Sequence, residues 1–118
     1  MLRRNRHQAL RYGLRAEFLS AIFLMLKGWK IMAFRHRNSF GEVDIIAFRQ
    51  ELVIFVEVKA RSNVKDALNA VSYLSQERIR SAGKAWLATH KDFHAFSYRC
   101  DIIAVIPWNL PKHFPDAF

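Results

Sequence analysis

Residues 39–61, SFGEVDIIAFRQELVIFVEVKAR, constrain the fold most, because they hold two apolar runs of strand length separated by a few polar residues. Val, Ile and Phe fill both runs, as is typical of buried β-strands, and the polar RQE between them predicts a tight turn. We therefore expect a β-hairpin with strands at 42–48 and 52–59. The second strand is apolar almost without interruption, which indicates burial on both faces.

A helix is predicted ahead of the hairpin, over residues 8–27. Apolar residues recur there at spacings of three and four, which predicts one buried helix face made of Leu10, Leu14, Phe18, Ile22 and Met25. Gly28 is the expected stop, because glycine takes a left-handed cap without strain. Residues 29–37 then predict a first strand, and NSFG at 38–41 is typical of a turn.

After the hairpin, residues 62–90 are rich in helix formers. One face of a helix is traced there by Ile79, Ala82, Gly83, Trp86 and Leu87. Residues 96–108 predict a fourth strand, and the tail at 107–118, with three prolines, is expected to be loop or extended. The element order α-β-β-β-α-β predicts an α/β fold, a mixed central sheet flanked by helices, in one domain spanning residues 1–118.

Positive charge is concentrated at the N-terminal end of the chain. The net charge is +9, and residues 1–37 hold nine Lys and Arg against Glu17 alone. Such a basic face favours a polyanionic partner, with nucleic acid ahead of acidic membrane, although a solvated basic helix that merely keeps the protein soluble is the alternative. Cys100 is the sole cysteine, which excludes an internal disulfide and indicates a reducing, cytoplasmic setting.

No membrane partner is expected, because the longest uncharged piece of the apolar run at 18–34 is far shorter than the ~20 residues that cross a bilayer.

Four charged residues interrupt the apolar hairpin, namely Glu42, Asp44, Glu57 and Lys59. Residues two apart in a strand share a face. We therefore expect Glu42 and Asp44 on one face of the first strand, with Val43 and Ile45 on the other. On the second strand we likewise expect Glu57 and Lys59 on one face and Val56 and Val58 on the other. Pairing of the two strands brings Asp44 near Glu57. Two such carboxylates suit a hard divalent cation, and Lys59 suits an attacking water or a phosphate. The alternatives are a partly exposed Glu57–Lys59 ion pair at a strand end, which would contribute little, and an Asp44 that bonds the turn at 38–41.

The segment GEVDIIA, followed thirteen residues after Asp44 by EVK, resembles the Asp…Glu-x-Lys signature of the PD-(D/E)XK nuclease superfamily. Together with RIRSAGKAWL, Asp101 and the terminal DAF, it makes residues 10–118 similar to the YraN-type family of uncharacterised bacterial proteins. The resemblance implies a restriction-endonuclease-like core and a metal-dependent endonuclease, or a Holliday-junction-resolvase-like protein, that hydrolyses DNA phosphodiester bonds.

The resemblance also implies roles for particular residues. Asp44, Glu57 and the Val58 carbonyl would bind Mg2+ (or Mn2+), Glu17 would assist from the first helix, and Lys59 would position water. Resolvase-like relatives imply a homodimer by analogy. Nucleic acid would be met by Gln76, at the start of the second long helix, and by the basic residues Arg3, Arg4, Arg6, Arg11, Arg15, Arg35 and Arg37.

Two other functions remain open. The chain could be a nucleic-acid-binding protein that keeps the fold without catalysis, or a small module whose basic helix docks on an acidic protein or lipid surface. His90 and His94 have metal-ligand spacing but are expected to be an incidental surface pair, and Glu42 has no assigned role.

Overall fold

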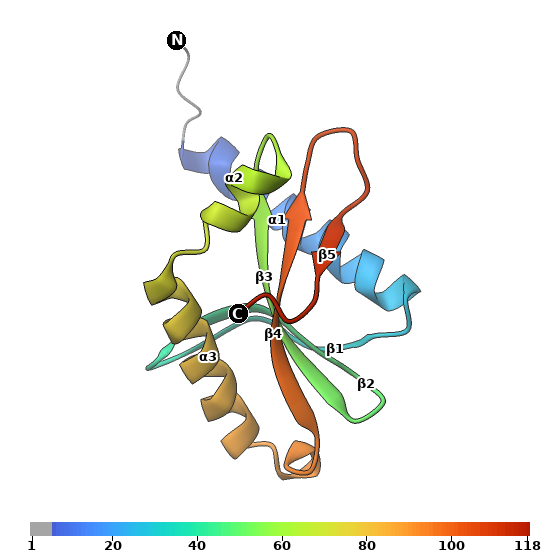
Figure 1. Cartoon of the computed structure of the whole chain (residues 1–118), viewed down its shortest axis with the longest axis vertical. Coiled ribbons are helices and arrows are strands. Elements are labelled where there is room, and N and C mark those ends of the chain that lie inside the picture. Colours follow the sequence, from blue (N-terminus) through green and yellow to red (C-terminus); the bar gives the residue numbers. More distant parts are fainter. Residues whose placement is uncertain (1–5) are drawn as a thin grey trace.

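A five-stranded sheet with helices on both faces forms the molecule (Figure 1). The computed structural model describes the backbone of residues 6–118 and the side chains from Tyr12 onward. The elements are α1 (Arg6–Leu26), β1 (Lys30–Asn38), β2 (Gly41–Arg49), β3 (Leu52–Ala60), α2 (Val64–Asn69), α3 (Tyr73–Ala88), the 3-10 helix η1 (Lys91–Phe93), β4 (Ser97–Val105) and β5 (Lys112–Phe114).

The strands follow one another across the sheet in chain order, β1-β2-β3-β4-β5. Neighbouring strands are antiparallel except β3 and β4, which are parallel because α2 and α3 carry the chain back between them. The predicted α/β class and the mixed sheet flanked by helices are therefore confirmed. The short strand β5 was not predicted, since its three residues lie within a proline-containing tail.

Two apolar clusters cover the two faces of the sheet. One joins α1 to the sheet through Leu24 and Ala16, and the other joins α3 to it through Ile79 and Trp86. All four residues from 53 to 56 on β3 are fully buried, which confirms the predicted burial of this strand on both faces. α1 and α3 therefore hold the central strands between them.

The end of α1 is set by Gly28, as predicted. Its backbone has a φ of 91°, and the Trp29 and Gly28 N–H groups donate to the carbonyls of Leu24 and Met25. These two bonds form a Schellman motif, in which glycine takes the left-handed position without a Cβ clash. The motif turns the chain directly into β1.

The predicted buried face of α1 is wrong. Leu14, Phe18, Ile22 and Met25 are 40%, 63%, 39% and 58% exposed, and the side chain of Leu10 lies outside the described residues. The sheet is met instead by a face of mainly small residues, made of Ala16, Glu17, Ser20, Ala21 and Leu24. Small side chains let the helix approach the sheet closely, and the Ser20 hydroxyl is satisfied by donating to the Ala16 carbonyl. Periodicity could not choose this face, because residues 18–26 are apolar nearly all round.

Asp101, fully buried on β4, fixes the C-terminal tail to the sheet. Its carboxylate accepts hydrogen bonds from Arg99, from His113 on β5 and from the backbone N–H of Asp116. Burial acts to raise the pKa of Asp101, but the hydrogen bonds from His113, Arg99 and Asp116 outweigh it and hold the pKa below its usual range. In the described part of the chain, no helix is long and apolar enough to cross a membrane.

Candidate functional site

The sheet forks where β2 and β3 part. The last pair between these strands is Ile45 and Val56, whereas β1 stays paired with β2 to its end and β3 stays paired with β4 to its end. Figure 1 shows the two arms diverging, with β2 leading to one side and β3 continuing upward. Asp44 and Glu57 are the next residues in register beyond the last pair, so both acidic residues stand at the fork.

Asp44 is held between the two arms by a backbone hydrogen bond. Its Oδ2 accepts from the Val58 N–H at 2.9 Å, and the residue is 9% exposed. The carboxylate thus takes the place that a strand neighbour would fill if the ladder continued. Asp44 does not bond the turn at 38–41, where the Asn38 side chain accepts from the Phe40 N–H instead.

Glu57 lies next to Asp44, and its pKa is raised. Burial, the charge of Asp44 and a hydrogen bond between the two carboxyl groups raise the pKa of Glu57 to about 9. Lys59 opposes this only in part, with its Nζ 3.7 Å from Glu57 Oε1. The pair therefore holds a proton at neutral pH when no cation is bound, because ionising two adjacent carboxyl groups, one of them buried, is costly.

Glu17 approaches the same fork from α1 but is bound to an arginine. Arg35 on β1 donates from Nε to Oε2 at 2.6 Å and from its Nη2 to Oε1 at 3.2 Å. Burial raises the pKa of Glu17, and the charges of Asp44 and Glu42 add to this while Arg35 opposes it. Arg35 holds a left-handed backbone, φ 54°, in the middle of a strand, a strained state that surrounding structure must enforce.

Glu42 lies apart from the acidic pair. It is the register partner of Arg37 on β1, and its Oε2 accepts from the Arg37 Nη2 at 2.9 Å near the surface. The expectation that Val43 and Ile45 share a face is wrong, since Val43 packs in the α3-side cluster and Ile45 in the α1-side cluster. Strict alternation between the two faces of the sheet therefore fails at Asp44, where β2 is no longer paired with β3.

The basic residues predicted to meet nucleic acid are only partly visible. Arg3 and Arg4 lie outside the described residues, as do the side chains of Arg6 and Arg11. Arg15 is exposed, Arg37 keeps an 80% exposed side chain while it bonds Glu42, and the charge of Arg35 is matched by Glu17.

Sequence reasoning missed Arg78 on α3. With Arg37 it lines a shallow groove of about 370 Å3 beside the β1–β2 turn. The turn packs on α3, because the Asn38 Nδ2 donates to the Ala82 carbonyl and a Cβ at Gly41 would lie 3.1 Å from the Arg78 carbonyl oxygen. No local signal in the sequence links residues so far apart in the chain.

Gln76 and the two histidines show no sign of joining the acidic pair. The Gln76 Nε2 donates to the Val71 carbonyl in the loop before α3, so its contact with nucleic acid stays a prediction. His90 stacks on Trp86 with ring centroids 3.9 Å apart. Among the residues that the structure describes, no three His, Cys, Asp or Glu side chains group closely enough to hold a metal ion.

Comparison with known proteins places the chain in a family. The model of "Uncharacterised protein family UPF0102" matches residues 16–105, a segment that contains the whole fork from Glu17 to Lys59. The chain belongs to the UPF0102 family. A UPF0102 protein of Rhizobium leguminosarum bv. trifolii is 54% identical over 113 residues, covering 96% of this chain and 93% of that protein. A UPF0102 protein of Rhizobium etli is 53% identical, covering 96% of this chain and 93% of that protein. A UPF0102 protein of Mesorhizobium japonicum is 47% identical, covering 97% of this chain and 91% of that protein.

The acidic pair of this UPF0102 chain fits a hard divalent cation. Mg2+ is commonly held by one or two carboxylates, with water and substrate phosphate supplying its other ligands, so a third acidic residue is not required. Burial and the charge of Asp44 raise the pKa of Glu57, so a bound cation would stabilise the ionised pair in place of the proton. Glu17 would have to leave Arg35 to become a ligand, and its metal role, like that of the Val58 carbonyl, stays a prediction.

Proposed function

We propose that this UPF0102 protein is a metal-dependent endonuclease of the PD-(D/E)XK type that hydrolyses DNA phosphodiester bonds, with branched DNA as the substrate class. The observation that carries the proposal is the pairing of Asp44 with Glu57 at the fork, with the Lys59 Nζ 3.7 Å from Glu57 Oε1. A buried pair of carboxyl groups destabilises a fold, and residues whose pKa is shifted this strongly concentrate at functional sites.

Asp44 and Glu57 would hold Mg2+ or Mn2+, which supplies Lewis-acid polarisation of a phosphate oxygen and lowers the pKa of a bound water. The Val58 N–H keeps Asp44 in place through its bond to Oδ2. Lys59 would place its Nζ near a non-bridging phosphate oxygen, where it stabilises the negative charge that builds up in the transition state. Water would add to phosphorus and give up one proton, the bond from phosphorus to one sugar oxygen would break, and that oxygen would take up a proton and leave as a hydroxyl.

Binding of the DNA backbone would fall to exposed basic residues around the fork. Arg37 and Arg78 line a groove that begins two residues from Asp44 along β2, with Glu42 at its edge. Phosphate contacts of this kind release counterions, so binding should weaken steeply as salt rises. The net charge of +9 favours the same partner over a neutral one.

A second candidate is a nucleic-acid-binding protein without catalysis. The specific observation in its favour is that Arg35 occupies both carboxylate oxygens of Glu17, which leaves two acidic residues instead of three at the fork. In that case the basic groove would bind DNA and the acidic pair would be a remnant of the fold.

The two candidates are separated by incubating labelled linear, flap and four-way-junction DNA with the protein in Mg2+ or Mn2+. For the nuclease we expect metal-dependent cutting that Asp44→Ala abolishes while DNA binding is kept. Glu77→Gln is the matched control, because Glu77 is a half-exposed carboxylate on α3 paired with Arg80. Binding without cutting of any of these DNAs would reject the nuclease in favour of the second candidate.

A further inference from the structure

The outer side of α1 presents large apolar side chains to solvent. Within residues 16–26, AEFLSAIFLML, the sole charged residue is Glu17, which turns toward the sheet. A helix that is apolar all round is normally covered on every side, yet the sheet covers only one side of this helix. We call the uncovered side the α1 apolar face; it consists of Leu14, Phe18, Leu19, Ile22, Met25 and Leu26, with Phe34 of β1 beside them, at exposures from 39% to 83%.

The size of the α1 apolar face suits a protein interface. From their exposed fractions, its side chains present roughly 600–700 Å2 of surface, at or above the largest patch of an ordinary monomer and close to the ~800 Å2 that each partner contributes to a standard interface. Covering so much apolar surface is strongly favourable, because burial stabilises by about 25 cal/mol per Å2.

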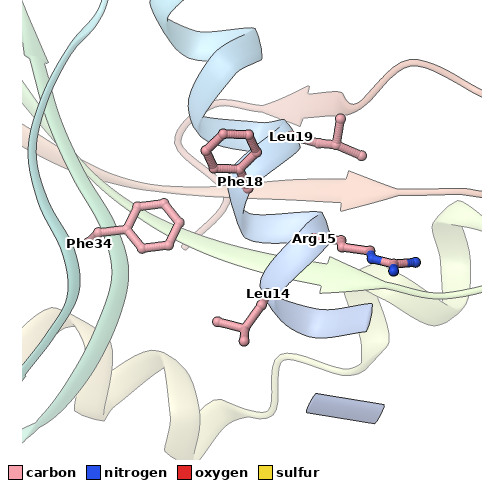
Figure 2. A pocket seen from close by; sticks show the side chains of 5 residues that line it. All are labelled: Leu14, Arg15, Phe18, Leu19 and Phe34. Carbon is pink, nitrogen blue, oxygen red and sulfur yellow. The ribbon is translucent and has the colours of Figure 1, made fainter. Parts of the chain in front are cut away.

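The α1 apolar face contains both a pocket and the protrusions that could fill it. A pocket of about 530 Å3 is lined by Leu14, Arg15, Phe18, Leu19 and Phe34. Figure 2 shows Phe34 reaching from β1 toward Phe18 and Leu14, with Arg15 and Leu19 on the other flank of the helix. Met25 and Leu26, 58% and 83% exposed, project about 10 Å further along the same helix, given a rise of ~1.5 Å per residue.

We propose that the α1 apolar face is the interface of a homodimer, in which α1 of a second copy packs antiparallel about a twofold axis near Ile22. A twofold interface must be self-complementary, and an axis midway between pocket and protrusions brings Met25 of each copy to the pocket of the other. Two chains of charge +9 repel each other in general, but no charged side chain from residues 16–26 lies on this face to oppose its counterpart. Arg15 stays at the rim, where it keeps contact with water.

A second copy fits this face better than a lipid surface or nucleic acid. A helix that lies on an acidic membrane carries Lys and Arg along its flanks, whereas the arginines of α1, at 6, 11 and 15, all precede the apolar stretch 16–26, which carries no Lys or Arg. Nucleic acid likewise needs cations that this stretch lacks. The proposal is independent of the nuclease proposal, since it involves neither Asp44 nor Glu57, and either can fail while the other holds.

The first test is the mass of the full chain in solution, measured by sedimentation equilibrium from about 1 to about 100 μM, the range in which interfaces of moderate affinity dissociate. We expect wild type to approach twice 13.9 kDa and Phe18→Glu to stay at 13.9 kDa, with a dissociation constant raised at least 100-fold. Phe18 is 63% exposed, so the substitution should leave the fold intact, which circular dichroism checks. Leu74→Glu is the matched control, since Leu74 is 58% exposed on α3 across the sheet, and it should behave as wild type.

The second test locates the twofold axis. Cys100 is the sole native cysteine and is buried, so Ile22→Cys introduces one accessible thiol per chain. Under mild oxidation we expect a disulfide-linked dimer from Ile22→Cys and none from Leu74→Cys. A wild type that is monomeric throughout the concentration range, a dimer that survives Phe18→Glu, or a monomer that instead sediments with acidic phospholipid vesicles would each overturn the proposal.

Discussion

Replacing Glu57 with glutamine should stabilise the metal-free protein at neutral pH. The pKa of Glu57 is about 9 in the folded chain, against an ordinary value of 4.5 in the unfolded chain, so folding must take up a proton at pH 7. Each pH unit above 4.5 costs about 1.4 kcal/mol, which makes this uptake cost about 3.5 kcal/mol at pH 7. Glutamine keeps the shape and can donate to Asp44 as the protonated acid does, without that cost.

The sign of the pH dependence follows from the raised pKa. The contribution of Glu57 to stability is fully present below pH 4.5 and is lost as pH rises toward 9, because the unfolded chain releases the proton that the folded chain keeps. The advantage of Glu57→Gln should therefore be below about 1 kcal/mol at pH 5 and about 3 kcal/mol or slightly more at pH 7. Between pH 5 and pH 7 the free energy of unfolding of the wild type should fall more steeply with pH than that of the variant. The difference in slope corresponds to one bound proton.

Urea unfolding of both proteins at pH 5, 6, 7 and 8 in the presence of EDTA measures this difference. Glu77→Gln serves as the control and should change the free energy of unfolding by less than about 0.5 kcal/mol, as exposed ion pairs do. Parallel pH profiles for wild type and Glu57→Gln would refute the reasoning, since they would mean that Glu57 is ionised in the folded protein. With Mn2+ in place of EDTA, wild type should gain stability that Glu57→Gln does not, because the cation binds the folded state alone.

Two further predictions concern the packing that positions the fork. Gly83→Ala should lower the free energy of unfolding in urea by about 1–3 kcal/mol, because a Cβ there would lie 2.5 Å from the buried Phe55 ring. Gly13→Ala should instead stabilise α1 by up to about 1 kcal/mol, since nothing lies within 4 Å of its new Cβ. Equal effects at the two glycines would contradict the close contact between α3 and β3. Asp101→Asn should lower the free energy of unfolding by about 3–5 kcal/mol, since it removes a buried charge from three partners, and should expose the C-terminal tail to limited proteolysis. A loss below about 1 kcal/mol would argue against the role of Asp101 in holding β5.

The acidic pair was predictable because its geometry is local. A hairpin with a tight turn determines which residues of its two strands lie opposite each other, so Asp44 and Glu57 could be matched from spacing alone. The protonated state of Glu57 was not predictable, because it depends on how much water the surrounding helices and strands exclude. Nor was the bond from Arg35 to Glu17, which joins residues on a helix and a strand that only packing brings together.

The pattern of apolar runs and turns by itself determined the order of the main elements from α1 to β4, the end of α1 at Gly28 and the burial of β3 on both faces. Each of these rests on backbone preferences or on spacing within one element. Only the tertiary structure decided which side of α1 meets the sheet, since a helix that is apolar nearly all round gives periodicity nothing to distinguish. The small face of Ala16, Ser20 and Ala21 packs closest, and the large side chains are left outside. That choice, made by steric fit between helix and sheet, turns Glu17 toward the fork on one side of α1 and leaves the candidate dimer interface on the other.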